Sequence, residues 1–166
     1  MDIIRNVIVM SLMSIVAYGF VVAHNDVAKP SADATMLQDE EVIVLISSDK
    51  KCVNAFSIER NHWSQLKFDT ELTPEATPIL YKGMVALKNR EYIYGYSAKV
   101  GAWDKIKVVG ESESQPMLGK DYIQVRTQNA VYVFGLNSAY WTAVNLTTGD
   151  VLKIGESAVN QAGATK

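Results

Sequence analysis

Short apolar runs alternate with polar breaks along the chain from Val42 onward. Runs such as VIVLIS and AVYVFG are rich in Val, Ile and aromatic residues, and breaks such as SDKK and KNRE separate them. These runs favour β-strands, because β-branched and aromatic side chains pack well on a pleated sheet. No segment after residue 42 shows a sustained helical period. We therefore expect an all-β domain over residues 42–156.

One spacing recurs in this domain: an aromatic residue is followed seven positions later by a Trp. The pairs are Phe56 with Trp63, Tyr96 with Trp103, and Phe134 with Trp141. The Trp residues are 40 and 38 positions apart. A gapless alignment on them matches Val44, Met84 and Tyr122, each 19 positions before its Trp. Three copies of a unit of about 40 residues indicate a repeat architecture, here three antiparallel β-meanders.

Each aromatic and its Trp fit opposite positions on the two strands of a hairpin. The same antiparallel register places Val53 opposite Leu66, with corresponding aliphatic pairs in the other two copies. Strand parity then puts the aromatic pairs on one face and the aliphatic pairs on the other. A sheet that is apolar on both faces needs a neighbour on each side. We expect stacked sheets that resemble propeller blades, with all three Trp residues in the core. A compact β-sandwich or barrel is the alternative.

Two segments carry a resemblance to known repeats, which covers about Val42 to Ile154. AVYVFGLNSAYWTAV resembles the strand–turn–Trp segment of a kelch blade, and NLTTGDVLKI is similar to the Thr-Gly turn of quinoprotein-like blades. The resemblance implies a β-propeller repeat. Closed propellers have four to eight blades, so three repeats leave three arrangements open. In the first, two chains associate into a ring. In the second, the repeats form an open or sandwich-like domain. In the third, a strand from 34–41 or from the C-terminus completes a barrel.

The N-terminal residues differ from the rest of the chain. Arg5 precedes an uncharged apolar run from Asn6 to Ala23, which is typical of a cleaved signal peptide or a membrane anchor over residues 1–23. We expect residues 24–41 to be a linker and residues 157–166 a flexible tail. The protein is then exported: periplasmic, extracellular, or anchored and facing outside the cytoplasm. Contact with a membrane is expected only through an uncleaved N-terminal segment.

Charge and composition argue against several kinds of chemistry. The net charge is −2, and no basic cluster predicts a nucleic-acid partner. Cys52 is the single cysteine, so the chain has no internal disulfide, and we expect this side chain to be buried in a strand. The chain shows no Gly-rich phosphate loop and no Asp-rich calcium loop. We assign no catalytic residue, no metal ligand and no cofactor.

Four residues near turns or rims are the candidate ligand contacts, because exposed aromatic platforms can bind sugar faces. They are Tyr92, Tyr94, Tyr140 and Asn61. The absence of a convergent polar cluster favours an exported, non-catalytic interaction module over an enzyme. Its ligand is expected to be a protein or a carbohydrate, and self-association into a homo-oligomer is one expected form. The alternatives are a small secreted hydrolase with a carboxylate pair and a lectin-like carbohydrate-binding domain.

Overall fold

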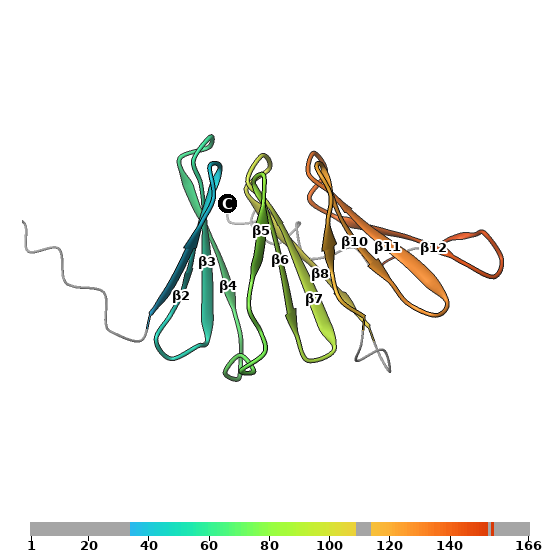
Figure 1. The fold of residues 1–166 in the computed structure, drawn as a ribbon, viewed down its shortest axis with the longest axis horizontal. Helices are drawn as coiled ribbons and strands as arrows, with labels where there is room; N and C mark the ends of the chain where they lie inside the picture. Colours follow the sequence, from blue (N-terminus) through green and yellow to red (C-terminus); the bar gives the residue numbers. More distant parts are fainter. Residues whose placement is uncertain (1–33, 109–113, 153, 155–166) are drawn as a thin grey trace, which may run out of the picture.

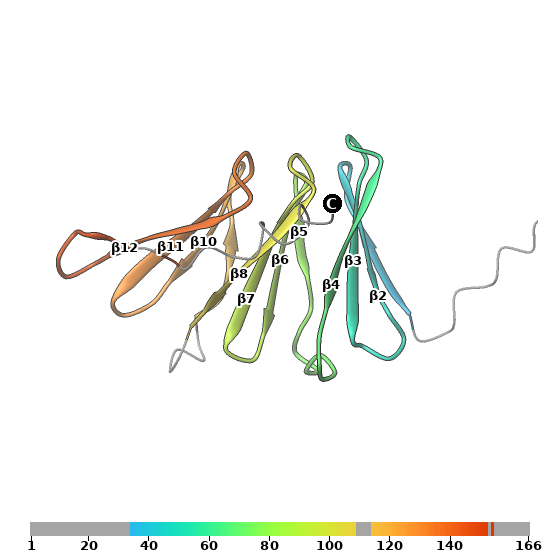
Figure 2. The same cartoon turned by 180° about the vertical axis from the view of Figure 1, so that it is seen from behind.

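A computed structural model describes residues 34–108, 114–152 and 154. Within these residues the protein is all-β, and its strands form three antiparallel sheets of four or five strands with no closed barrel. Figure 1 shows the sheets lying side by side in chain order, like successive blades, and the view from behind in Figure 2 shows the same arrangement. The expected all-β, blade-like architecture is confirmed.

Each sheet is a meander in which successive strands are neighbours. The first sheet consists of β1 (Thr35–Gln38), β2 (Val42–Ile46), β3 (Cys52–Ser57) and β4 (His62–Lys67). The second sheet consists of β5 (Ile79–Tyr81), β6 (Met84–Asn89), β7 (Tyr92–Ser97) and β8 (Ala102–Lys107). The third sheet consists of β9 (Met117–Leu118), β10 (Tyr122–Arg126), β11 (Ala130–Gly135), β12 (Trp141–Asn145) and β13 (Val151–Leu152).

The β-domain begins earlier than expected, because β1 lies inside the predicted linker 24–41. This strand pairs with β2 and so extends the first sheet, and it does not complete a barrel. The turn between them is held by Asp39, whose Oδ1 accepts hydrogen bonds from the amides of Glu41 and Val42, both at 2.8 Å. The predicted signal peptide or anchor at 1–23, the linker up to residue 33 and the tail at 157–166 lie outside the described residues. Among the residues described, no helix has the length and hydropathy to span a bilayer.

The predicted hairpin registers are confirmed in all three sheets. Each aromatic faces its Trp across the strands, with ring centroids 5.1, 5.0 and 5.4 Å apart in the first, second and third sheets. The aliphatic pairs also form, as Val53 opposite Leu66, Ile93 opposite Ile106 and Val131 opposite Val144. These cross-strand pairs are the unit of packing from which each sheet is built.

The turn between each aromatic and its Trp explains why their spacing is constant. The residue two positions before each Trp has a left-handed backbone, with φ of 50° at Asn61, 76° at Gly101 and 53° at Ala139. In the second and third sheets its amide donates to the carbonyl four residues earlier, at 2.7 Å from Gly101 and 2.9 Å from Ala139. The geometry of this turn fixes the register, so the other turn residues can vary.

The gapless alignment of the repeats is correct for the second and third sheets and wrong for the first. Met84 lies opposite Ser97 and Tyr122 opposite Gly135, whereas Val42, and not Val44, lies opposite Ser57. The longer β2–β3 connection produces this offset of two residues. Because the offset is even, the same faces stay apolar.

The core lies in two interfaces, and in each the aliphatic face of one sheet packs against the aromatic face of the next. The first interface buries Val42, Val44, Val53 and Ala55 against Val85, Leu87, Tyr94 and Tyr96. The second buries Met84, Ala86, Ile93 and Ile106 against Ile123, Val125, Phe134 and Trp141. Only the middle sheet is covered on both faces by described residues.

The expectation that all three Trp residues are buried holds only in part. Trp141 is 3% exposed, Trp103 is half-buried, and Trp63 is 48% exposed. The reason is that each aromatic face points toward the preceding sheet, and no described residues form a sheet before the first one. Cys52 is likewise half-buried, in β3, and not buried.

Candidate interaction surfaces

The outer face of the first sheet is apolar and has no described neighbour. We define it by Met36, Ile43, Leu45, Phe56 and Trp63, which share one face through the strand registers. Met36 is 63% exposed, and Trp63, whose ring packs against its cross-strand partner Phe56, is 48% exposed. Contiguous exposed apolar side chains of this kind mark surfaces that bind another molecule.

The outer face of the third sheet is also apolar. We define it by a set of residues that points away from the second sheet: Met117, Tyr122, Val131, Val133, Val144 and Val151. Met117 is 57% exposed and Val151 is 75% exposed. Repeat arrays normally end in polar caps, and neither end of this stack has one within the described residues.

The inner interfaces contain a hydrogen bond that recurs at equivalent positions. The indole Nε1 of Trp103 donates to the carbonyl of Ser64 at 3.4 Å, and that of Trp141 donates to the carbonyl of Asp104 at 3.3 Å. In both cases the acceptor is the residue that follows the Trp of the preceding sheet. The packing between sheets is therefore specified by polar contacts as well as by apolar area.

Serine hydroxyls make a second recurring contact between the sheets. Ser57 Oγ donates to the carbonyl of Ala98 at 2.7 Å, and Ser97 Oγ donates to the carbonyl of Leu136. Both serines are buried at the ends of their strands. The equivalent position of the third sheet is Gly135, which has no hydroxyl to offer a following sheet.

Asp104 is buried, and its carboxylate accepts hydrogen bonds from two backbone amides. Its Oδ2 accepts from the amide of Trp141 at 2.9 Å, and its Oδ1 accepts from the amide of Lys105 at 2.7 Å. These bonds satisfy the charge between the second and third sheets and fix the start of β12.

Two of the predicted ligand contacts lie on β7 and take part in packing. Tyr94 is buried in the first interface, where its ring lies 5.3 Å from that of Phe68 in an edge-to-face arrangement. Burial raises the pKa of Tyr94, and the neighbouring Tyr92 adds to this shift. Tyr92 is half-buried, and the Nζ of Lys105 lies 5.2 Å from its ring centroid. The expectation that Tyr94 is an exposed platform is wrong, because the first sheet and Phe68 cover it.

The other two predicted contacts, Asn61 and Tyr140, are exposed turn residues. Asn61 occupies the left-handed turn position of the first sheet, where a short polar side chain is well tolerated. Tyr140 belongs to the corresponding turn of the third sheet, while Tyr92 and Tyr94 begin their strand at the opposite end. The structure does not bring the four residues together into one site.

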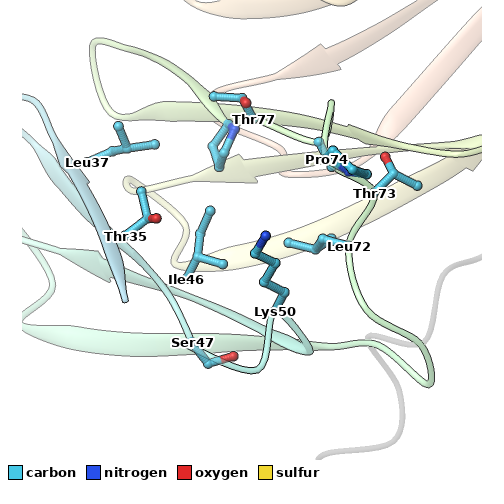
Figure 3. Close-up of a pocket in the computed structure, with 11 residues that line it drawn as sticks. Thr35, Leu37, Ile46, Ser47, Lys50, Leu72, Thr73, Pro74 and Thr77 are labelled. Atoms are coloured by element: carbon cyan, nitrogen blue, oxygen red, sulfur yellow. The ribbon is translucent and has the colours of Figure 1, made fainter. Parts of the chain in front are cut away.

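A small cavity of about 170 Å³ opens between the first sheet and the segment before β5. In Figure 3, Leu37 and Thr35 of β1 line one side, and Lys50 reaches between Ile46 and Leu72. A second cavity of about 180 Å³ lies beside Lys107 and Tyr132. No Asp or Glu lines either one, so neither offers the carboxylate pair of a glycosidase.

Two solvent-exposed contacts shift the pKa of a side chain. Lys107 Nζ lies 3.2 Å from Glu91 Oε1, and this hydrogen bond raises the pKa of the lysine. The hydroxyl of Ser47 lowers the pKa of the exposed Asp49. No group of three or more His, Cys, Asp or Glu residues that could hold a metal ion occurs in residues 34–108 and 114–152.

Sequence reasoning did not identify Trp63 as an exposed residue. Trp63 was expected in the core, yet it is the most prominent aromatic of an open face. The order of the copies could have predicted this exposure, because the aromatic pair of the first copy has no earlier copy to pack against.

Comparison with known proteins gives no family. No family model and no curated protein matches the sequence. Among solved structures, the extracellular domain of the putative one-component system BT4673 from B. thetaiotaomicron matches at 12% identity and a TM-score of 0.37, over 73% of this chain and 16% of that chain. KlHsv2 with loop 6CD replaced by a Gly-Ser linker matches at 11% identity and a TM-score of 0.40, over 73% of this chain and 52% of that chain. The chain thus spans about half the length of one of these proteins and a sixth of the other.

Proposed function

We propose that this protein is an exported, non-catalytic interaction module that binds protein through the outer faces of its first and third sheets. The observation that carries the proposal is the exposed apolar side chains at both ends of the stack, Trp63 and Met36 at one end and Val144 and Val151 at the other. Export is inferred from the apolar run at residues 6–23. The kelch and quinoprotein-like resemblance agrees with a blade-like interaction role.

Protein suits these faces better than a carbohydrate does. Each face spans all the strands of a sheet and presents aliphatic and aromatic side chains with few charges. Broad apolar surfaces pair with apolar surfaces of another protein, whereas sugar binding needs polar groups that converge around an aromatic platform. Of the candidate platforms, the rings of Tyr92 and Tyr94 lie 6.2 Å apart but Tyr94 is buried, and Tyr140 lies in a turn of another sheet, so the three form no common platform.

Photo-crosslinking in the native host tests the proposal. A photoreactive phenylalanine analogue replaces Trp63 in one variant and Val144 in another, and a third carries it at Tyr140, an exposed turn residue outside both faces. We expect protein adducts at the first two positions, found in the extracytoplasmic fraction and lost when a neighbouring face residue becomes Asp. Adducts at Tyr140 alone, or full-length protein in the cytoplasm, would contradict the proposal.

A further inference from the structure

The inner interfaces show what kind of surface each outer face can pack against. We propose that each outer face binds a second copy of this chain. In this arrangement the outer face of the first sheet in one copy packs against the outer face of the third sheet in the other. The inference rests on the proposed function, because it names the protein that these faces bind.

The two outer faces are the two halves of an interface that the chain already forms twice. The aliphatic half is Val53 with Leu66 in the first interface and Ile93 with Ile106 in the second, and the equivalent pair on the outer face of the third sheet is Val131 with Val144. The aromatic half is Tyr96 with Trp103 and then Phe134 with Trp141, and the equivalent pair on the first sheet is Phe56 with Trp63. Each end of the stack therefore presents the half that the other end lacks.

The recurring indole hydrogen bond extends to the same contact. Trp103 and Trp141 each donate to the carbonyl of the residue after the preceding Trp. Continued across two copies, the rule pairs the Nε1 of Trp63 with the carbonyl of Thr142 in the second copy. A Trp that becomes buried needs such an acceptor. An unrelated partner would have to supply this geometry independently, so a second copy is favoured over a different protein.

Two positions of the third sheet depart from the inner pattern and weaken the contact. Gly135 takes the place of Ser57 and Ser97, so one hydrogen bond between sheets is missing. Val133 takes the place of Gly95, where an added Cβ would be only 2.9 Å from the Phe134 ring. The next sheet therefore cannot approach Val133 as closely as Phe134 approaches Gly95. We expect an association that is reversible at micromolar concentrations.

The number of copies follows from the kind of contact. Contact between two different faces is head-to-tail, and it gives a ring where the rotation closes. Two copies supply six sheets, which lies within the four to eight of closed propellers, and three copies would supply nine. The structure therefore points to a dimer in which both contacts are made at once.

The first test uses the unaltered chain, purified in full length in a mild detergent. Sedimentation over a dilution series from about 100 µM to 0.1 µM should show a monomer and a species of twice the chain mass. Because Trp63 is the exposed Trp, its emission should move to shorter wavelength as the dimer forms, and a Trp63→Phe variant should lose this shift. A chain that stays monomeric throughout the range overturns the inference.

Charged substitutions then separate the two faces. Trp63→Asp and Val144→Asp each place a charge in one face, and each should weaken dimerisation by roughly 30-fold or more, as the loss of a hot-spot contact does. Tyr140→Asp is the matched control and should leave the dimer intact. All three sites are exposed, and melting curves should show that the variants remain folded; Trp63→Ser and Val144→Ser replace any that do not.

Mixing the two variants identifies head-to-tail contact. Each variant keeps the face that the other has lost, so an equimolar mixture should form a heterodimer through one contact although neither variant dimerises alone. Dimerisation of either variant alone that is as strong as that of the unaltered chain overturns the inference, because it shows that one face binds the same face of another copy. A monomeric chain that still crosslinks to another protein at Trp63 overturns the second copy but leaves the proposed function standing. A monomeric chain that forms no adducts contradicts both the second copy as the occupant and the proposed function.

Discussion

The middle sheet and the end sheets share one hairpin pattern but differ in burial. In β6 of the second sheet five of six residues are buried, whereas the equivalent β2 of the first sheet has three of five; in β8 two of six are buried, whereas the equivalent β4 has none. The register of the hairpin that carries each aromatic–Trp pair, the pair itself and the left-handed turn residue are the same in all three sheets. Burial is thus a property of the neighbours and not of the strand, and the open faces of the end sheets are the unfinished part of a repeating structure.

The largest contrast is expected between equivalent Trp residues. Trp141→Ala should lower the free energy of unfolding by about 3–5 kcal/mol, because it removes a large buried side chain and leaves a cavity. Trp63→Ala should cost about 1 kcal/mol in the monomer, mainly its contact with Phe56. Denaturant unfolding at a concentration where the chain is monomeric measures both. Equal losses would show that the first sheet is covered by residues of its own chain.

A buried polar contact allows a second comparison between an inner interface and an outer face. Asp104→Ala leaves the Trp141 amide without its acceptor between the second and third sheets, and it should cost about 1–3 kcal/mol. Asp104→Asn keeps an acceptor oxygen and is the control, with a smaller loss. Thr142 is the equivalent residue on the outer face, and Thr142→Ala should change monomer stability little. Urea unfolding of the three variants checks the order, and an Asp104→Ala protein as stable as the parent would contradict the role of this carboxylate.

Alkaline titration should report on the burial of Tyr94 and Tyr96. Burial raises the pKa of Tyr94 and Tyr96 above the usual 10.0. Below that value both are protonated in the folded and unfolded states, so they add no pH dependence. Above it the unfolded chain loses protons first, and stability should fall by up to about 1.4 kcal/mol per pH unit for each residue. Absorbance at 295 nm should show Tyr94 and Tyr96 ionising only when the protein unfolds.

The sequence predicted the repeating part of the fold well. The spacing of Phe56 and Trp63, repeated twice, correctly gave the hairpin registers, because a constant separation across a turn keeps the same two residues opposite each other in every copy. It failed where a position depends on the neighbouring sheets. Trp63 and Trp141 have the same local pattern and opposite burial, and Tyr94 is covered by Phe68 from the segment that follows the first sheet. The two-residue offset at Val42 was missed because the length of a hairpin loop does not change the apolar pattern on either side.

The smallest expected effect would come from completing the pattern at Gly135. Gly135→Ser supplies the hydroxyl that Ser57 and Ser97 use to bind the following sheet, and its acceptor would be the carbonyl of Ile58 in the second copy, which is equivalent to Ala98. An added Cβ would lie 2.8 Å from Ser138 Oγ, a side-chain end that can rotate away. One hydrogen bond contributes about 0.5–1.5 kcal/mol, so each of the two contacts in the dimer should lower the dissociation constant by roughly two- to tenfold while monomer stability stays nearly constant. Sedimentation of Gly135→Ser beside Gly135→Ala measures this gain. If the alanine variant tightened the dimer equally, the hydroxyl would have no part in the contact between copies.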